Sequence, residues 1–315
     1  MKTERRLRAL RAALVTTAVA VAAATTAGTA FATGAPGGAD RARAEAEARH
    51  RAAEPPKAGA LTGEPGTVHT PSFSMTAVDR QTQNLYLYFP DEAGGFDPRY
   101  DVGVSFEGFV NSIDVDNDKD GWSDGGWSRM VDGRLFYSWI DEDLESHRRD
   151  VGTGWNIYTQ VLSPGDLGGA GEADLLGLDK TGVLWLYLAY PEGALTPRIR
   201  VGGGWDQYTQ LAGQGDLTGD GKADIVARDK SGVLWLYKGT GDYKAPFTGR
   251  TKIGGGWNTF DRLLSVGDLD SDGTADLIAR KPSGDLLRYS GTGEGQTVFK
   301  SPVRIGTGFQ VYNLL

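Results

Sequence analysis

Cysteine is absent from the 315-residue sequence, and histidine occurs only three times. Without cysteine the chain can form no disulfide framework, thiolate zinc site, iron–sulfur cluster or cysteine nucleophile. The histidines, His50, His69 and His147, lie far apart in the sequence, so they do not indicate a histidine-built metal centre. Basic charge is in deficit too, because the formal net charge is −8 at pH 7. Proteins that bind nucleic acids carry basic stripes, so this charge disfavours a nucleic-acid partner.

Residues 1–32 have the pattern of a secretory signal peptide. A basic start that includes Lys2, Arg5 and Arg6 precedes an apolar stretch over residues 12–24, and Ala30-Phe31-Ala32 supplies a small-x-small cleavage signal. The apolar stretch is short and rich in alanine, which makes it a poor membrane span. No second apolar segment follows. We therefore expect a secreted, extracellular product with no membrane span in the mature chain.

Residues 33–68 are predicted to be a disordered leader. Alanine alternates with arginine and glutamate over residues 41–53, a composition that allows a transient helix but offers no apolar stripe to bury. Pro55-Pro56, Gly63 and Gly66 then interrupt the chain. The remaining residues, 69–315, are predicted to form one folded domain.

This domain repeats a unit of roughly 50 residues. The triplet Gly-Asp-Leu recurs at residues 165–167, 215–217 and 267–269, and a fourth copy of the unit starts at Asp116. Each unit contains an Asp-rich loop, an apolar run, a turn with glycine, an aromatic run and a Gly-Trp segment. The runs are short and rich in β-branched and aromatic residues, so they predict about four strands in each unit. Four strands in such a unit are typical of a β-propeller blade.

The two ends of the domain predict how the ring closes. Residues 72–79, 85–88 and 100–103 match the second, third and fourth strands of a unit whose first strand is missing. Residues 306–312 match residues 202–208, which lead into a first strand, and the sequence then ends. We therefore predict an all-β fold, a five-bladed β-propeller of four-stranded blades in which the C-terminal strand completes the N-terminal blade. Such closure removes exposed sheet edges.

Three Asp-rich loops share a spacing that predicts metal binding. Oxygen-bearing side chains occupy the first, third, fifth and ninth positions, and glycine occupies the sixth. Crowded carboxylates repel one another unless a cation lies among them, and a site built only of oxygen ligands favours Ca²⁺ over Mg²⁺ or Zn²⁺. The predicted ligands are Asp116, Asp118, Asp120, Trp122 and Asp124; Asp216, Thr218, Asp220, Lys222 and Asp224; and Asp268, Asp270, Asp272, Thr274 and Asp276, of which Trp122, Lys222 and Thr274 would contribute backbone carbonyls.

A fourth loop keeps Asp166 and Asp174 but has Gly168 and Ala170 at the third and fifth positions. We predict that it does not bind metal, which leaves about three structural Ca²⁺ ions. The three intact loops differ from an EF-hand, because the ninth position closes the site and a strand follows it.

The loops, framed by Gly-Asp-Leu and by Ala-Asp-Leu or Ala-Asp-Ile, resemble the FG-GAP/VCBS repeat family of extracellular calcium-binding propellers. The resemblance covers about residues 69–315. The Gly-Gly-Gly-Trp segments are also similar, less specifically, to tachylectin-type five-bladed lectins. Membership in this family implies a propeller with a binding or adhesion role, and it does not specify the ligand.

Four aromatic residues, Trp155, Trp205, Trp257 and Phe309, occupy equivalent positions in the units. They are candidates for ligand binding, because flat rings can stack on sugars and repeated weak sites would gain avidity on a polymeric glycan. Packing between blades is the alternative role for these rings.

An enzyme would need residues that break the repeat. One irregular polar cluster does so: Asp141, Glu142, Asp143, Glu145, His147, Arg148 and Arg149 lie between two predicted strands. A solvated charged loop explains this cluster, and no Gly-x-Ser-x-Gly, phosphate-loop or zinc motif is present in the sequence. We predict no catalytic residues and a monomeric binding or adhesion module for an extracellular glycan or protein. The alternatives are a glycan-active hydrolase or lyase and a scaffold that binds only proteins.

Overall fold

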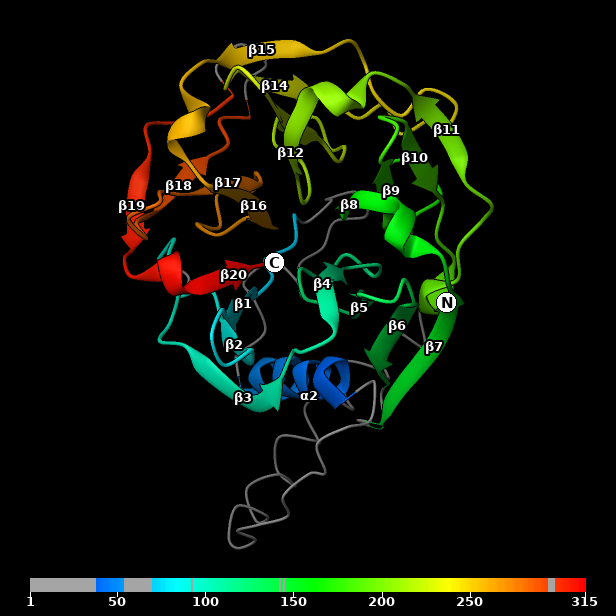
Figure 1. Cartoon of the computed structure of the whole chain (residues 1–315), viewed down its shortest axis with the longest axis vertical. Coiled ribbons are helices and arrows are strands. Elements are labelled where there is room, and N and C mark those ends of the chain that lie inside the picture. The colour runs from blue at the N-terminus through cyan, green and yellow to red at the C-terminus, as the bar shows by residue number, and fades with distance from the viewer. Residues whose placement is uncertain (1–37, 54–69, 92, 142, 144, 294–297) are drawn as a thin grey trace, which may run out of the picture.

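The computed structural model describes residues 38–53, 70–91, 93–141, 143, 145–293 and 298–315. Within them the chain forms five antiparallel four-stranded sheets, arranged around a central axis as the blades of a propeller (Figure 1). The predicted fold class and the predicted number of blades are therefore confirmed. The signal peptide predicted over residues 1–32 lies outside the described residues.

In each blade four strands follow one another from the innermost, beside the axis, to the outermost. Blade 1 contains β20 (Tyr312–Leu314), β1 (Met75–Asp79), β2 (Asn84–Tyr88) and β3 (Tyr100–Ser105). Blade 2 contains β4 (Phe109–Val115), β5 (Gly125–Met130), β6 (Leu135–Ile140) and β7 (Ser146–Gly152). Blade 3 contains β8 (Tyr158–Gly165), β9 (Asp174–Asp179), β10 (Leu184–Tyr187) and β11 (Ile199–Gly202). Blade 4 contains β12 (Tyr208–Ala212), β13 (Ile225–Asp229), β14 (Leu234–Tyr237) and β15 (Thr251–Gly254). Blade 5 contains β16 (Arg262–Gly267), β17 (Asp276–Arg280), β18 (Leu286–Ser290) and β19 (Val303–Gly306).

The ring closes between the two ends of the domain, as predicted. Strand β20 pairs with β1 in antiparallel register, with Ala77 opposite Leu314 and Asp79 opposite Tyr312. The last strand of the chain, β20, thereby supplies the innermost strand of blade 1. It lies beside the axis of the ring (Figure 1). This pairing protects the inner edge of β1, which would otherwise expose unpaired backbone groups.

The hydrophobic core consists of layers between neighbouring blades. Strand β14 illustrates why, because Leu234 and Leu236 are fully buried whereas Trp235 and Tyr237 are only partly buried. Alternation of this kind gives each blade two faces that must be covered. Four apolar clusters fill the seams between blades 2 and 3, 3 and 4, 4 and 5, and 5 and 1.

Arginines reinforce three of these four seams. Arg228 in β13 donates from Nη1 to the carbonyl oxygens of Trp257 (3.0 Å) and Phe260 (2.5 Å) of the next blade. Arg129 and Arg280 make the same pair of bonds to blades 3 and 1. Leu178 occupies the corresponding register position in blade 3, opposite Gln160. The seam between blades 3 and 4 therefore lacks this arginine.

Helix α2 (Gly38–Ala53) fills the fifth seam, between blades 1 and 2. It contacts β3, β6 and β7 and lies between these strands in Figure 1. Ala39 packs with Val78, Leu85 and Phe106, and Ala46 packs with Leu87 and Phe89. The predicted disorder is thus wrong for residues 38–53, whereas residues 33–37 and 54–68 of the predicted leader lie outside the described residues.

The buried face of α2 includes the charged residues Asp40 and Arg43, so the sequence of this helix contains no apolar stripe. Arg43 pairs with Asp114 of β4 and donates to Thr76 (3.0 Å) and Ser112 (3.1 Å). Asp40 accepts a 3.0 Å bond from Ser138 Oγ. Buried charges are tolerated when they are paired and hydrogen-bonded. The propeller supplies these partners, so the helix is stabilised by tertiary contacts rather than by its own amphipathicity.

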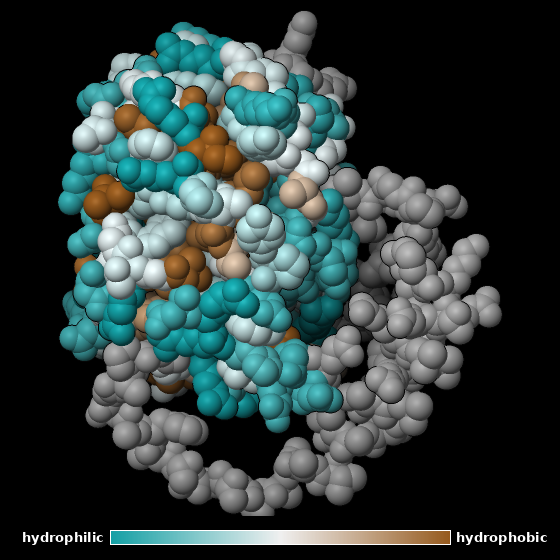
Figure 2. All heavy atoms as spheres, turned by 90° about the vertical axis from the view of Figure 1, so that its right-hand side faces the viewer, coloured by the Kyte–Doolittle hydropathy of each residue, from teal (hydrophilic) through white to brown (hydrophobic). Residues whose placement is uncertain are grey.

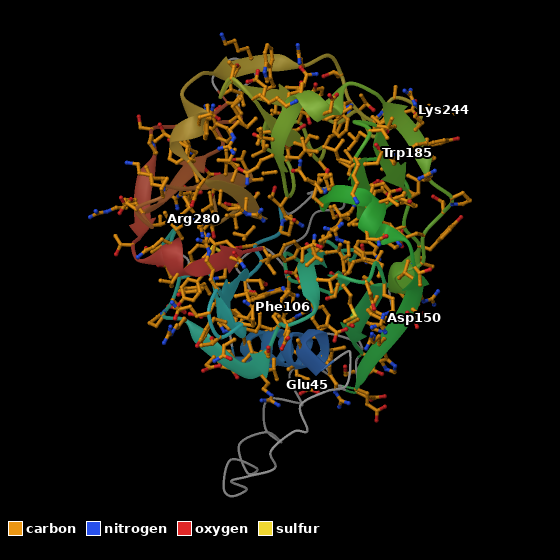
Figure 3. All side chains as sticks on the ribbon, in the orientation of Figure 1. Glu45, Phe106, Asp150, Trp185, Lys244 and Arg280 are labelled. Carbon is orange, nitrogen blue, oxygen red and sulfur yellow. The ribbon has the colours of Figure 1, made fainter. Side chains whose placement is uncertain are left out.

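The surface on the side shown in Figure 2 is largely polar, and apolar residues form separate patches on it. Figure 3 places Phe106 on the side of α2 that faces the ring and Glu45 on its outer side. No helix in the described part of the chain is long and apolar enough to cross a membrane.

Candidate metal centres

The Asp-rich loops connect the first and second strands of blades 2, 3, 4 and 5. They therefore lie at the same end of the ring. Blade 1 has no such loop, because its first and second strands, β20 and β1, come from opposite ends of the domain.

The first and ninth positions of each loop organise its backbone. In the loop over residues 268–276, Asp268 accepts bonds from the backbone N–H groups of Asp272 (3.1 Å) and Gly273 (2.7 Å). Asp276 accepts a 2.9 Å bond from Leu269 N–H. Equivalent bonds hold the loop over residues 116–124, where Asp116 accepts from Gly121 (2.8 Å). Through these bonds the backbone of each loop curves around the carboxylates of its first and ninth residues.

Two positions in each loop have left-handed backbone conformations. Glycine at the sixth position was expected, and Gly121 and Gly273 have φ values of 90° and 91°. The fourth position is also left-handed, and in two loops it is not glycine: Lys119 has a φ of 61° and Ser271 a φ of 58°. Such residues cost free energy and are frequent at functional sites. Sequence reasoning missed this position because lysine and serine do not signal it.

Two loops bring three predicted ligands together. One ligand oxygen from each of Asp116, Asp118 and Asp124 lies within 4.8 Å of the others. Asp268, Asp270 and Asp276 form the same arrangement in blade 5. This spacing allows several oxygens to bind one ion, and their all-oxygen chemistry suits a hard divalent cation.

The loop in blade 5 also contains buried oxygens without hydrogen-bond partners. Oδ1 of Asp276 and Oδ1 of Asp270 are both buried and have no partner among the described residues. Asp276 is completely buried as a residue. Unpaired buried carboxylate oxygens are costly, and a coordinated cation would satisfy them. This observation supports the fit of these residues to a metal ion.

Burial and mutual repulsion perturb the same carboxylates. Burial, with the charge of Asp124 as the next cause, raises the pKa of Asp116 to about 8. Burial and the charge of Asp270 raise the pKa of Asp276 to about 7, although the Leu269 bond opposes this. Burial also raises the pKa of Asp118 to about 6. The loops thus concentrate negative charge that nearby cations, such as Arg288 beside Asp270 at 2.9 Å, neutralise only in part.

The third loop, over residues 216–224, has the same architecture with a hydroxyl at its third position. Asp216 accepts bonds from Gly219 N–H (2.7 Å) and Gly221 N–H (2.5 Å). Asp224 is completely buried, and burial raises its pKa to about 7. Oγ1 of Thr218 is buried without a hydrogen-bond partner in the described part of the chain. Thr218 therefore places a hydroxyl oxygen where the other two loops have a carboxylate.

Cations outside the loops hold the fifth-position carboxylates, which the sequence did not reveal. Asp120 pairs with Arg51 of helix α2. Asp272 pairs with Lys300 at 2.5 Å, and Asp220 lies 3.7 Å from Lys238. A metal ion that used these carboxylates would compete with the three ion pairs. The carbonyl oxygens of Trp122, Lys222 and Thr274 stay predicted ligands.

The loop over residues 166–174 shows what the scaffold does without ligands at the third and fifth positions. Asp166 accepts from Gly169 (2.6 Å) and Gly171 (2.9 Å), and both oxygens of Asp174 accept backbone bonds. A Cβ atom at Gly168 would lie 2.5 Å from Leu188 Cδ2. This loop therefore keeps its shape through backbone bonds without side-chain ligands at the third and fifth positions, and its failure to bind metal stays a prediction.

The irregular polar cluster gathers at the turn between β6 and β7. Ligand atoms of Asp141, Glu145 and His147 lie within 4.8 Å of one another, and His147 Nε2 is 2.5 Å from Asp141 Oδ2. The other oxygen of Asp141 accepts bonds from the N–H groups of Asp143 and Glu145. The hydrogen bond from His147 lowers the pKa of Asp141. Asp141 thus stabilises the turn through these hydrogen bonds, a role that suits a charged loop at the surface.

The four equivalent aromatic residues are buried between blades. Trp155, Trp205, Trp257 and Phe309 are only 6–7% exposed, and each belongs to one of the four inter-blade clusters. The ring of Trp205 lies 4.6 Å from that of Tyr237, and the ring of Trp257 lies 4.8 Å from that of Tyr289. Their packing role is evident. Sugar stacking by these rings stays a prediction, and little ring surface is exposed for it.

Several solved structures are similar to this chain at low identity. The BP39L lectin from Burkholderia pseudomallei is 12% identical with a TM-score of 0.47, over 74% of this chain and 69% of the lectin. The WD40 domain of SCAP from fission yeast is 11% identical with a TM-score of 0.34, over 76% and 54% of the two chains. A putative 6-phosphogluconolactonase from Bacteroides fragilis is 14% identical with a TM-score of 0.37, over 76% and 69%. None is similar enough for its ligand or activity to be transferred.

Two sequence families match the part of the chain that contains the second and third predicted calcium loops. The FG-GAP-like repeat matches residues 216–279, and the FG-GAP repeat matches residues 260–299. No curated protein matches the chain. The family matches confirm the resemblance that the loop spacing indicated. The protein is therefore a five-bladed β-propeller in which residues 216–299 match FG-GAP repeats.

Proposed function

We propose that this protein is a secreted binding module whose propeller is stabilised by about three Ca²⁺ ions and whose ligand is an extracellular glycan. The supporting observation is the loop in blade 5, where Asp270 and Asp276 keep buried, unpartnered Oδ1 atoms within a cluster of three carboxylates. Ca²⁺ prefers six to eight oxygen ligands, whereas Mg²⁺ demands a stricter octahedron. The loops in blades 2 and 4 would hold the other two ions.

In this proposal the ions are structural. Each loop joins the two innermost strands of its blade, so a bound ion would fix the end of the blade beside the axis. Extracellular calcium modules work at Kd values of about 10⁻⁴ to 10⁻³ M. Residues 1–32, with their signal-peptide pattern, support export to a compartment where such concentrations occur.

Exposed tyrosines support a glycan as the ligand. Tyr190 is 57% exposed, Tyr100 is 40% exposed and Tyr243 is 39% exposed. Tyrosine rings combine a flat apolar face with a polar tip, which suits the surface of a sugar ring. An extracellular protein partner is the alternative, because exposed tyrosines are also enriched at protein interfaces.

A glycan array with the mature protein tests this proposal, run once in Ca²⁺ and once in EDTA. Binding of a defined glycan class in Ca²⁺ that weakens in EDTA would support a calcium-stabilised lectin. Binding of no glycan, with capture of an extracellular protein instead, would favour the protein scaffold. Release of new reducing ends from the bound polysaccharide would favour the hydrolase or lyase, for which the cluster of Asp141, Glu145 and His147 is the candidate site.

A further inference from the structure

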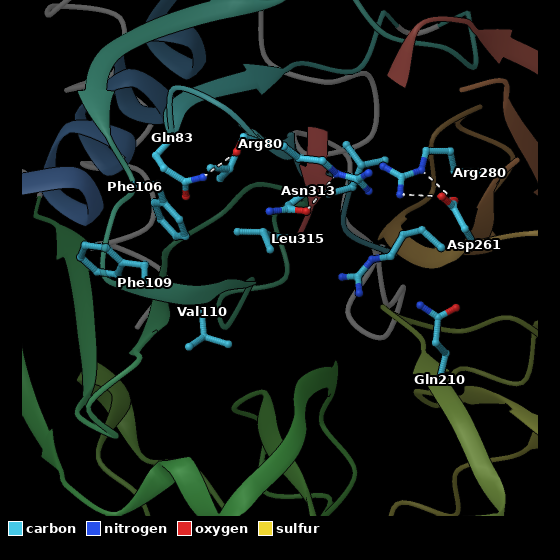
Figure 4. Close-up of a pocket in the computed structure, with 13 residues that line it drawn as sticks. Arg80, Gln83, Phe106, Phe109, Val110, Gln210, Asp261, Arg280, Asn313 and Leu315 are labelled. Atoms are coloured by element: carbon cyan, nitrogen blue, oxygen red, sulfur yellow. Dashed lines mark hydrogen bonds and ion pairs between the residues drawn. The ribbon is translucent and has the colours of Figure 1, made fainter. Parts of the chain in front are cut away.

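A cavity of about 350 Å³ lies at the end of the ring opposite to the Asp-rich loops. Innermost strands of four blades contribute to it, with Val110 from β4, Gln210 from β12 and Asn313 from β20 (Figure 4). Arg262 from β16 also lines it. Its volume falls within the range of ligand sites, about 300–1,000 Å³. A smaller hollow of about 70 Å³ lies among the Asp-rich loops.

The two sides of this axial cavity differ in chemistry. Phe106, Phe109 and Val110 form an apolar side, next to helix α2 in Figure 4. Arginines and amides form the opposite side, among them Arg80, Arg262, Gln210 and Asn313. A flat ligand with one apolar face and several polar groups would match both sides.

Arg262 breaks a repeated contact around the axis. At the equivalent positions of blades 3 and 4, Gln160 Oε1 accepts a 2.8 Å bond from Leu211 N–H and Gln210 Oε1 accepts a 3.2 Å bond from Leu263 N–H. Each amide thereby ties its innermost strand to the next one. In blade 5 arginine replaces the amide, and Leu315 N–H donates to Thr76 O (3.0 Å) instead. Arg262 is therefore not required for the strand-to-strand contact that its counterparts make.

Arg262 also forms no ion pair with the residues that the structure describes, although the charge of Asp261 acts to raise its pKa. Its Nε atom is buried and has no hydrogen-bond partner among the described residues. Asp261, the neighbouring carboxylate, is taken up by Arg280, which donates to it from Nε (2.8 Å) and Nη2 (3.1 Å). Arg80 uses its Nε for Asn313 Oδ1 (3.2 Å). Burial and the positive charge of Arg280 lower the pKa of Arg262 to about 10.

Positive charge thus exceeds negative charge in the axial cavity. The guanidinium groups of Arg80, Arg262 and Arg280 line the cavity, whereas Asp261 is the one acidic side chain among its lining residues. Arg262 is partly buried, and its Nε atom, which is buried, has no partner in the described part of the chain. An unpartnered buried donor is costly, and the planar guanidinium is suited to a bidentate anion such as a carboxylate. An anion is therefore the suitable partner, and a carboxylate would match the plane of the guanidinium.

We propose that the axial cavity binds a single sugar ring that carries a carboxylate, with the carboxylate on Arg262 and the ring against Phe106 and Phe109. The choice of a sugar rests on the proposed function, whereas the carboxylate is inferred from the cavity alone. Gln210 and Asn313 are placed to bond the hydroxyl groups. This assigns an acidic sugar as the ligand class and the axis as its site, away from the calcium loops.

Calorimetric titration of the mature protein with glucuronate tests this proposal, with glucose and inorganic phosphate as comparison ligands. We expect glucuronate to bind at least tenfold more tightly than either. Equal binding of glucose would overturn the role of the carboxylate, and equal binding of phosphate would overturn the role of the sugar ring. Absence of glucuronate binding would overturn the proposal as a whole.

Arg262→Gln is the decisive variant, because it restores the amide that blades 3 and 4 carry at this position. We expect it to weaken glucuronate binding at least tenfold while the urea midpoint of unfolding stays at or above that of the wild type. Unchanged binding would place the ligand elsewhere. Calcium-dependent binding of neutral glycans on the array without glucuronate binding would overturn this inference and leave the proposed function standing. If glucuronate binds, Arg262→Gln abolishes this binding and no glycan on the array binds, the inference about the axial cavity would stand and the proposed function would be overturned.

Discussion

Arg43 of helix α2 forms an ion pair with Asp114 of β4, and the two side chains are only 6% and 10% exposed. The pair joins the segment before the propeller to the innermost strand of blade 2. It lies in the one seam that a helix, rather than a second blade face, fills. The helix is therefore an integral part of the ring.

Substitution Arg43→Ala should destabilise the protein by about 3–5 kcal/mol, because Asp114 would remain buried without its partner. Arg41→Ala is the matched control, since Arg41 is 67% exposed and pairs with Glu45 at the surface. We expect the control to change the free energy of unfolding by less than about 0.5 kcal/mol. Urea unfolding measures both. Equal effects of the two substitutions would mean that α2 does not dock between blades 1 and 2.

Glu47 should make the stability of the protein depend on pH. Burial raises its pKa from the ordinary value of 4.5 to about 7, although Arg43 and Ser74 act to lower it. A carboxyl group with a raised pKa in the folded state contributes stability that is complete below the unfolded pKa and is lost as pH rises through the folded pKa. Between pH 4.5 and pH 7 we expect a loss on the order of 1–3 kcal/mol.

The test compares wild type with Glu47→Gln over this pH range by urea unfolding. Asp40 and Asp114 are the other carboxylates near Arg43, and both are present in both proteins. The difference between the two curves therefore isolates Glu47. Parallel curves would contradict the prediction, whatever their vertical offset.

Asp276→Asn should remove one of the three proposed calcium sites. The substitution takes away a charge and one of the two unpartnered oxygens in the loop of blade 5. Glu172→Gln is the control, because it removes one carboxylate from the loop of blade 3, which lacks ligands at the third and fifth positions. Calorimetry with Ca²⁺ should give three sites for wild type and control and two for the variant. Three sites in Asp276→Asn would exclude this residue as a ligand.

The loops and the closure of the ring could be predicted from sequence because their signals are local. Matching residues 306–312 with residues 202–208 located the strand that completes blade 1. The spacing of Asp268, Asp270 and Asp276 indicated carboxylates that the fold does bring together. In both cases the residues that carry the signal also form the structure.

Helix α2 and the cations at the loops could not be predicted, because their partners are remote in sequence. Arg43 and Asp114 are 71 residues apart, and Asp40 and Ser138 are 98 residues apart. Arg51 reaches Asp120 over 69 residues. When charged residues occupy the buried positions of a helix, its sequence pattern predicts a solvent-exposed helix until the groups that pair with those residues are known.

Trp257→Ala should destabilise the propeller by about 3–5 kcal/mol, because Trp257 fills the seam between blades 4 and 5 and the substitution leaves a cavity. Tyr190→Ala is the control at an exposed ring and should cost less than about 0.5 kcal/mol. Glycan binding should show the opposite order: Tyr190→Ala should weaken glycan binding although it leaves stability almost unchanged. A stable Trp257→Ala protein that has lost only glycan binding would instead identify Trp257 as a stacking platform.

Leu314→Asp should open the ring. Leu314 lies opposite Ala77 in the pairing of β20 with β1, and it is buried in the cluster between blades 5 and 1. A carboxylate there would be buried without a partner, so β20 should detach and leave β1 with an exposed edge that promotes association. Val311→Asp introduces the same charge three residues earlier at a side chain that is 44% exposed, and it should behave as the wild type. Size-exclusion chromatography should show aggregation, and hydrogen exchange should show loss of protection over residues 75–79, in Leu314→Asp alone. Retained protection and a monomeric peak in this variant would mean that β1 does not need the C-terminal strand.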